Sequence, residues 1–247
     1  VTIRVDKEKG EAVIDFTGTS PQHPGNYNAP KAIATAAVLY VFRTLVGRDI
    51  PLNEGCLKPL HIILPERSMI NPEYPAAVIA GNTEVSQAIT ECLYGALDVI
   101  AGSQGTMNNF IWGNDDFQNY ETIAGGTGAG PGFDGASCVQ VHMTNTRATD
   151  PEVLETRFPV RIERIAHRTG SGGRGRWDGG EGMHRVLRFL EPVTVTTLCS
   201  HREVPVPGRE GGGEGATGEN RVLRADGSVE RLPGNARSEL CAGDAIE

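Results

Sequence analysis

The side chains that could do chemistry are concentrated between Gly81 and Arg147, where short polar clusters interrupt apolar sequence. Three ionisable residues lie inside these clusters, Glu84, Glu121 and His142. A carboxylate or an imidazole held among amide side chains can be tuned to act as a general acid or base. These three are therefore candidate catalytic residues, although Glu84 also suits the first turn of a helix and His142 also suits a structural role.

A second set of polar residues is better suited to holding a substrate than to moving protons. Carboxamides and hydroxyls both donate and accept hydrogen bonds, so they can bind a planar amide or a carboxylate. The candidates of this kind are Gln104, Asn108, Asn109, Thr122 and Asn145. Asn108, Asn109 and the backbone amides near Gly125 and Gly126 are also candidates for stabilising a developing oxyanion.

The glycine-rich run from Gly125 to Gly130 has two interpretations. Glycine has no Cβ, so backbone N–H groups in such a run can approach a ligand closely, which makes Gly125 and Gly126 candidate substrate-binding positions. Tight turns or close packing would explain the same composition. The spacing matches neither a phosphate-binding P-loop nor a dinucleotide-binding turn, and both interpretations stay open.

Several other classes of site lack support in the sequence. There is no Gly-x-Ser-x-Gly elbow and no His-Glu-x-x-His motif, which argues against a serine hydrolase and a zincin. The five cysteines are far apart and form no Cys-x-x-Cys pair, so we predict reduced thiols and no metal site within this chain. Reduced cysteines and the lack of a signal peptide at the first residues favour the cytoplasm.

Charge and hydropathy limit the kinds of partner. The net charge is −8 and the pI is near 5.3, whereas nucleic acids and anionic membranes bind basic surfaces. No apolar stretch reaches the length needed to span a membrane. We therefore predict neither nucleic-acid nor membrane binding.

Hydrophobic periodicity predicts the elements that must position the polar clusters. Helices are expected over residues 31–46 and 83–101. The second has apolar residues at three-and-four spacing, namely Val85, Ala88, Ile89, Cys92, Leu93, Ala96, Val99 and Ile100. Strands are expected over residues 108–112, 120–124 and 136–143, which places the polar motifs at the ends of helices and strands.

The last third of the chain predicts a strand-dominated lobe. Alternating segments cover residues 183–190, 193–199, 220–224 and 229–232, and the glycine-rich segment 170–182 is expected to be an ordered turn anchored by Trp177. The expected fold is α+β and β-rich, with two principal helices packed on antiparallel sheets. We expect an α+β lobe over residues 1–150 and a β-rich lobe over residues 151–247, packed as one unit.

Together, the polar motifs resemble those of the hydantoinase B/oxoprolinase family. The resemblance is dense from Asp15 to about Pro207 and rests on Gly-Asn-Thr-Glu-Val-Ser-Gln, Gln-Gly-Thr-Met-Asn-Asn, Tyr-Glu-Thr and His-Met-Thr-Asn-Thr. Members of this family are about twice as long, so the resemblance implies a chain truncated at its N-terminus and at its C-terminus. In the related acetone carboxylases the preceding portion binds a metal, so any divalent metal is expected there.

The resemblance implies an ATP-dependent opening of a cyclic amide such as 5-oxoproline or a hydantoin. A partner A subunit or domain would use ATP to phosphorylate the ring carbonyl, and the B portion would carry the activated ring through hydrolysis. ATP is then bound by the partner and not by this chain, and the active form is a hetero-oligomer. The fragment alone is expected to be inactive.

Two alternatives remain open at this point. The same family includes subunits of acetone- and acetophenone-type carboxylases, which fix bicarbonate instead of adding water. The chain could also be a catalytically inert scaffold that assembles with the A subunit. The sequence does not identify the ring substrate, the metal or the oligomeric state.

Overall fold

The computed structural model describes residues 1–247 and divides them into two compact units. The N-terminal unit covers Val1–Val99 and the C-terminal unit covers Ile100–Glu247. The expected boundary at residue 150 differs from this division. The reason is that strand β4 (Asn109–Gly113) pairs with β8 (Val193–Leu198), which ties the second half of the polar motifs to the strand-rich lobe.

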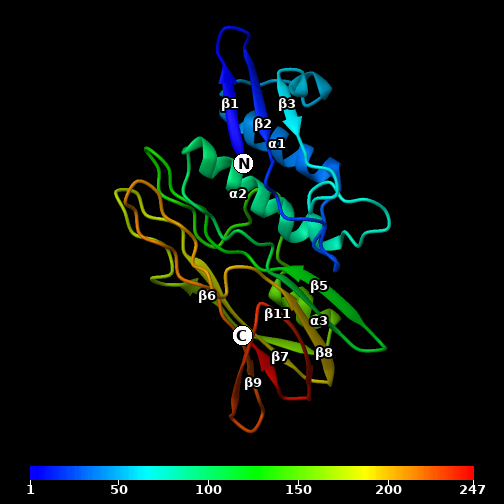
Figure 1. Ribbon diagram of the computed structural model, residues 1–247. Coiled ribbons are helices and arrows are strands. Elements are labelled where there is room, and N and C mark those ends of the chain that lie inside the picture. Colours follow the sequence, from blue (N-terminus) through cyan, green and yellow to red (C-terminus); the bar gives the residue numbers. More distant parts are fainter. The chain divides into compact units, whose positions relative to one another are not determined.

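The N-terminal unit combines a small sheet with two helices (Figure 1). Its elements are β1 (Thr2–Asp6), β2 (Glu11–Asp15), α1 (Lys31–Leu45), η1 (Glu54–Leu57), β3 (Leu60–Ile63), η2 (Gly81–Val85) and α2 (Ser86–Leu97). Strands β1 and β2 form an antiparallel hairpin and β3 joins β2 in parallel. The helix expected over residues 31–46 is confirmed as α1, which packs against α2.

Helix α2 differs from its prediction in both its start and its buried face. Residues Gly81–Val85 form a π-helical turn before it, and it ends at Asp98 in the left-handed conformation. The small residues Ala88, Cys92 and Ala96 are exposed, while the polar side chains of Ser86, Gln87 and Thr90 are fully buried. The larger apolar residues of the predicted face, Val85, Ile89 and Leu93, are buried as expected. Apolar periodicity therefore identified only part of the buried surface, because this helix also buries hydrogen-bonding side chains.

The C-terminal unit is built from two antiparallel sheets. Its remaining elements are β5 (Gln118–Thr122), α3 (Pro151–Arg157), β6 (Val160–Arg168), β7 (Gly182–Phe189), β9 (Asn220–Leu223), β10 (Val229–Leu232), β11 (Asn235–Leu240) and β12 (Ala245–Ile246). One sheet has the strand order β11-β8-β4-β5 and the other has the order β10-β9-β12-β7-β6. The fold is therefore α+β and β-rich, as the sequence predicted.

A single apolar core joins these two sheets. Trp112 of β4 packs edge-on against Phe117, Phe158 and Phe189, with ring centroids 5.1–6.2 Å apart. The buried cluster also includes Val195 of β8. Side chains from both sheets meet in it, as expected for two sheets packed face to face. Strand β4 of the β4–β5 hairpin is therefore anchored in this core through Trp112.

The strand expected over residues 136–143 does not form. Only Val139 makes a ladder contact, an isolated bridge to Gly125. Cys138 and His142 have φ angles of 54° and 49°, in the left-handed region that extended strands exclude. The segment is instead a loop. The glycine-rich segment 170–182 is ordered, as expected, since the Gly180 amide donates to the Thr127 carbonyl and the Asp178 carbonyl accepts from the Gly135 amide.

Candidate functional site

The candidate residues are divided between the two units. Glu84 lies in the π-helical turn of the N-terminal unit and is 3% exposed. All the other candidates belong to the C-terminal unit, at the ends of β4 and β5 and in the loops beside them. A single π-helical turn inside a helix often marks a functional position. Glu84 is therefore described by itself, and the following geometry concerns the C-terminal unit.

Asn109 and Thr122 face each other across the β4–β5 hairpin. The Asn109 side chain donates to the Leu198 carbonyl at 2.8 Å and accepts a hydrogen bond from the Tyr120 hydroxyl at 2.7 Å. The Thr122 hydroxyl contacts that of Thr146 and accepts from the Gln140 amide at 2.9 Å. These polar groups form an internal network that fixes the hairpin.

Asn108 connects this hairpin to a residue that the sequence did not single out, Arg202. Its φ of 48° turns its side chain out of the strand direction, and its carboxamide donates to the Ile123 carbonyl at 3.1 Å. The Asn108 oxygen accepts a hydrogen bond from Arg202 Nη2 at 3.0 Å. A left-handed asparagine is uncommon and indicates that the surrounding contacts hold it in place.

Glu121 has a cationic partner. Its Oε2 accepts a hydrogen bond from Arg185 Nη2 of β7 at 2.8 Å, and the two side chains are 4% and 6% exposed. Its other oxygen accepts from the Thr149 amide at 3.3 Å. A buried carboxylate engaged on both oxygens is well suited to holding β5 and β7 together.

His142 lies beside a serine that no motif indicated. Ser103 Oγ is 3.0 Å from His142 Nε2 and accepts a hydrogen bond from the Gly128 amide at 2.9 Å. Because the Gly128 N–H already donates to it, the Ser103 hydroxyl can direct its own proton to the imidazole. A hydroxyl and an imidazole at this distance can share a proton, which is the chemistry of a general acid or base.

The glycine run is explained by close packing. A Cβ on Gly126 would lie 2.0 Å from the Gly180 carbonyl oxygen, and one on Gly125 would lie 2.2 Å from Gln104 Oε1. Neither glycine has a positive φ. Gln104 donates from its amide nitrogen to the Thr106 carbonyl at 2.6 Å, and its buried Oε1 has no hydrogen-bond partner. The run thus brings two backbone segments together around Gln104.

Asn145 lies apart from these contacts, in an exposed position of the loop after His142. The structure thus joins Asn108, Asn109, Thr122 and Glu121 through the hairpin and its neighbours, and His142 with Ser103. Ser103, Arg185 and Arg202 were missed by sequence reasoning. Ser103 directly precedes the Gln104–Asn109 motif, but Arg202 follows β8 and its only signal is its charge.

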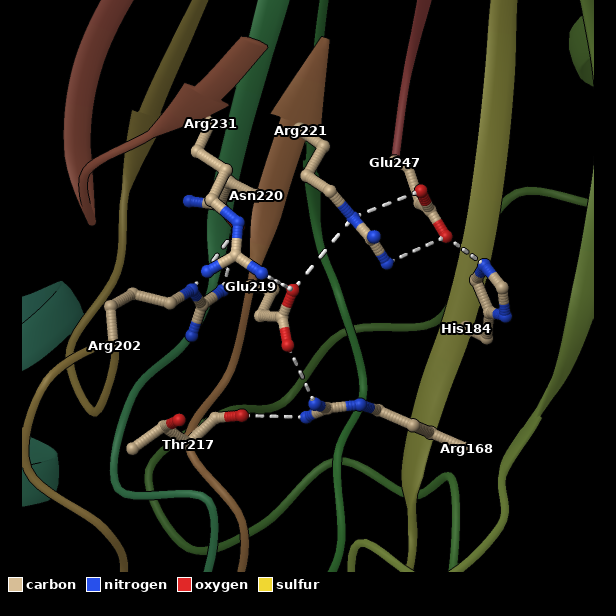
Figure 2. Close-up of polar contacts among 9 residues, drawn as sticks. All are labelled: Arg168, His184, Arg202, Thr217, Glu219, Asn220, Arg221, Arg231 and Glu247. Carbon is tan, nitrogen blue, oxygen red and sulfur yellow. Dashed lines mark hydrogen bonds and ion pairs between the residues drawn. The ribbon is translucent and has the colours of Figure 1, made fainter. Parts of the chain in front are cut away.

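Arginines gather around two glutamates near Arg202 (Figure 2). Glu219 pairs with Arg168, Arg221 and Arg231 at 3.4–3.8 Å, and Arg221 also pairs with Glu247 at 3.2 Å. His184 forms an ion pair with Glu247 as well. We call these residues, with Arg202 and Asn220, the arginine cluster. It concentrates positive charge in a protein whose net charge is −8.

No group of three or more His, Cys, Asp or Glu side chains in the chain is arranged to hold a metal ion. None of the helices is both long and apolar enough to cross a membrane.

Comparisons with known proteins agree with one another. The model of the family described as hydantoinase B/oxoprolinase matches residues 1–247. The chain is 46% identical over 245 residues to 5-oxoprolinase 1 of Arabidopsis thaliana, which covers 99% of this chain but only 19% of that protein. The chain thus spans about a fifth of the length of this relative.

Two solved structures share the fold. The ATP-dependent caprolactamase from Pseudomonas jessenii superimposes with a TM-score of 0.82 at 21% identity, over 99% of this chain and 46% of that one. The nucleotide-free structure of acetone carboxylase has a TM-score of 0.80 at 16% identity, over 99% and 39%. At these identities the likeness shows the fold alone.

Proposed function

Because the chain belongs to the hydantoinase B/oxoprolinase family, we propose that it is a portion of an ATP-dependent hydrolase of cyclic amides, of the 5-oxoprolinase or N-methylhydantoinase type. The observation that carries the proposal is the 46% identity to a 5-oxoprolinase along 99% of the chain. The ring substrate is 5-oxoproline or a hydantoin. The hydrolytic role is assigned to the protein that contains this chain.

The proposed chemistry is divided between two components. An amide carbonyl is a poor electrophile, so a hydantoinase A-type subunit or domain uses ATP to phosphorylate it. The B portion, to which this chain belongs, then positions water and stabilises the oxyanion that forms. The ATP-dependent caprolactamase with the same fold supports the use of ATP. The five free cysteines support a reducing compartment, and we place the protein in the cytoplasm.

Within this scheme His142 is the general base, and Ser103 holds its Nε2 in position. Asn108, Asn109 and the amides near Gly125 and Gly126 are the oxyanion donors, while Gln104, Thr122 and Asn145 contact the ring. Glu84 is a second candidate acid or base. Glu121, which is paired with Arg185, fixes the hairpin that carries Asn109 and Thr122.

The test is ATP-dependent turnover of 5-oxoproline and a panel of hydantoins by the full-length B protein with its A partner. We expect His142→Ala and Glu84→Gln each to lower kcat by about 100-fold or more, the usual contribution of a general acid or base. Folding and binding of the A partner should be normal in both variants. Unchanged turnover in both would overturn these roles and leave the chain as an assembly scaffold.

A carboxylase function is the second candidate, since acetone carboxylase shares the fold of this chain. The two activities are separated by one comparison in the same assay. The A and B proteins are supplied with ATP and either a lactam, or acetone or acetophenone with bicarbonate. Consumption of the ketone with bicarbonate, and none of the lactam, would replace the hydrolase proposal with the carboxylase.

A further inference from the structure

Arg202 holds a positive charge that no carboxylate neutralises. Its guanidinium donates to Asn220 Oδ1 from Nε at 3.1 Å and from Nη2 at 3.0 Å, to the Ser200 carbonyl at 3.0 Å and to Asn108 Oδ1 at 3.0 Å. All of these acceptors are neutral oxygens. They fix the orientation of the guanidinium and leave its full charge in place.

The carboxylates of the arginine cluster are already used by the other arginines. Glu219 and Glu247 pair with Arg168, Arg221, Arg231 and His184, and neither forms an ion pair with Arg202 (Figure 2). Three arginines and one histidine therefore share two glutamates. Arg202 is the arginine of the cluster that has no glutamate partner, and its contacts reach the polar motif of the candidate site through Asn108.

The backbone at Gly218 lies close to the Arg202 guanidinium. A Cβ on Gly218 would lie 2.2 Å from Arg202 Nη1, so a larger residue there would displace the end of the arginine side chain. The Gly218 amide donates to the His201 carbonyl at 2.8 Å, which holds this glycine against the loop that carries Arg202. The four hydrogen bonds of Arg202 use four of the five N–H groups of the guanidinium, and one N–H on Nη1 remains for a ligand.

A preorganised and half-buried cation without a counter-ion is a binding site for an anion, because the cost of holding the charge is recovered when the anion binds. We propose that Arg202 binds the carboxylate of the substrate and that the protein therefore prefers cyclic amides that carry a carboxylate. The inference rests on the proposed function, and it identifies 5-oxoproline, rather than an uncharged lactam or hydantoin, as the type of ring accepted.

The first test compares two rings that differ by the carboxylate alone. The full-length protein with its A partner is assayed with 5-oxoproline and with 2-pyrrolidinone, in wild type and in Arg202→Gln. Losing a charge-assisted hydrogen bond is expected to raise KM for 5-oxoproline by about 10- to 100-fold. The loss for 2-pyrrolidinone should be smaller by about tenfold or more, because that ring has no carboxylate and is affected only through the contact of Arg202 with Asn108.

Two further variants separate charge from geometry. Arg202→Lys keeps the charge but not the planar fork, so it should recover part of the loss for 5-oxoproline. Arg231→Gln is the matched control, because Arg231 belongs to the same cluster, is 79% exposed and contacts Glu219 only at 3.6 Å. Equal losses for both rings in Arg202→Gln, or an equal loss in Arg231→Gln, would overturn the proposal.

Binding measured by calorimetry without ATP distinguishes a failure of this inference from a failure of the proposed function. The probes are 5-oxoproline, 2-pyrrolidinone and inorganic phosphate. Binding of 5-oxoproline that Arg202→Gln weakens, in a protein that hydrolyses neither ring, would keep the carboxylate site and reject the hydrolase. Absence of 5-oxoproline binding to wild type, or loss of phosphate binding alone in Arg202→Gln, would reject the carboxylate site.

Discussion

Two arginines of the C-terminal unit lie near the same polar motifs but in opposite electrostatic surroundings. Arg185 contacts the Glu121 carboxylate at 2.8 Å, and both side chains are almost fully buried. Arg202 is half-buried and donates only to carboxamide and carbonyl oxygens. The first arginine forms a closed pair, whereas the second keeps an uncompensated charge.

The difference distinguishes a charge that stabilises the fold, on Arg185, from a charge that is left to bind a ligand, on Arg202. Burying both members of a pair is tolerable because each neutralises the other, and the pair then fixes the two strands that carry them. A cation held without a counter-ion contributes little to folding by its charge. Its value lies in the anion that it can accept. The following predictions test this distinction, from the largest expected effect to the smallest.

Arg185→Gln should be the most destabilising of these changes. Removing one partner leaves the Glu121 carboxylate buried without a counter-ion, which costs about 3–5 kcal/mol. The measurement is hydrogen exchange of the β5 and β7 amides in the full-length protein, because it reports local stability.

The double variant Glu121→Gln with Arg185→Gln is the matched control. It removes both charges together, so it should recover part of the loss seen in the single variant. A single variant whose β5 and β7 amides exchange as slowly as those of wild type would show that the closed pair does not stabilise the unit.

Gly126→Ala should be the next most destabilising change. Its Cβ would meet the Gly180 carbonyl oxygen at 2.0 Å, and a backbone atom cannot move aside as a side chain can. Overpacking of this kind costs about 1–3 kcal/mol. Thermal unfolding of the full-length protein gives the measurement, with Gly132→Ala as a comparison in the same segment.

Gly132 has a positive φ of 95°, and a Cβ there would meet no atom within 4 Å. Its substitution therefore measures backbone strain without overpacking. If Gly126→Ala proves no more costly than Gly132→Ala, close packing is not the reason for glycine at position 126, and the ligand-cradle interpretation returns.

Asp244 provides a second closed pair, whose contribution depends on pH. Burial alone would raise the pKa of this carboxyl, but the amides of Cys241 and Ala225 and the Arg224 guanidinium lower it below its ordinary value of 3.8. Its folded-state pKa is thus below its unfolded-state pKa. The stabilisation is fully present above pH of about 3.8 and is lost as the pH falls through the folded-state value.

Asp244→Asn should remove that dependence. The unfolding free energy of the Asp244→Asn variant should be lower than that of wild type at pH 6. The unfolding free energies of the two proteins should converge in acid, below the ordinary aspartate pKa. Urea denaturation at a series of pH values checks this. A constant difference between the two proteins at every pH would show that the carboxylate form of Asp244 adds nothing to stability.

Much of the fold followed from the sequence because its signals are local. Strands β4, β5, β7, β8, β9 and β10 were predicted to within a few residues, since alternation and turn residues specify them directly. Helix α2 buries Ile89 and Leu93 as predicted, but it also buries Ser86, Gln87 and Thr90, which apolar periodicity does not indicate. The strand expected over residues 136–143 failed at Cys138 and His142, whose positive φ angles no composition rule indicates.

The contacts within the candidate site were harder to predict from the sequence than the fold was, because they join residues that are far apart in the chain. Glu121 lies in a polar motif, and the sequence therefore suggested a catalytic role for it. Its partner Arg185 lies 64 residues later on another strand, so the sequence did not indicate the ion pair. Arg202 lies 94 residues from Asn108 and carries no motif. Pairings across such separations depend on which strands meet, so the sequence suggested the polar residues but not which of them are neutralised.

Arg202→Gln should have the smallest effect on stability. The variant loses hydrogen bonds to neutral oxygens, each worth about 0.5–1.5 kcal/mol, but it also relieves a half-buried cation of its desolvation cost. Glutamine can retain part of the contact with Asn108 or Asn220. We therefore expect a net loss of about 1 kcal/mol or less by urea denaturation, well below that of Arg185→Gln. A loss equal to that of Arg185→Gln would make Arg202 a structural residue. A small loss together with weakened 5-oxoproline binding separates it from the closed pair, because a side chain needed only for folding would not discriminate between two rings that differ by a carboxylate.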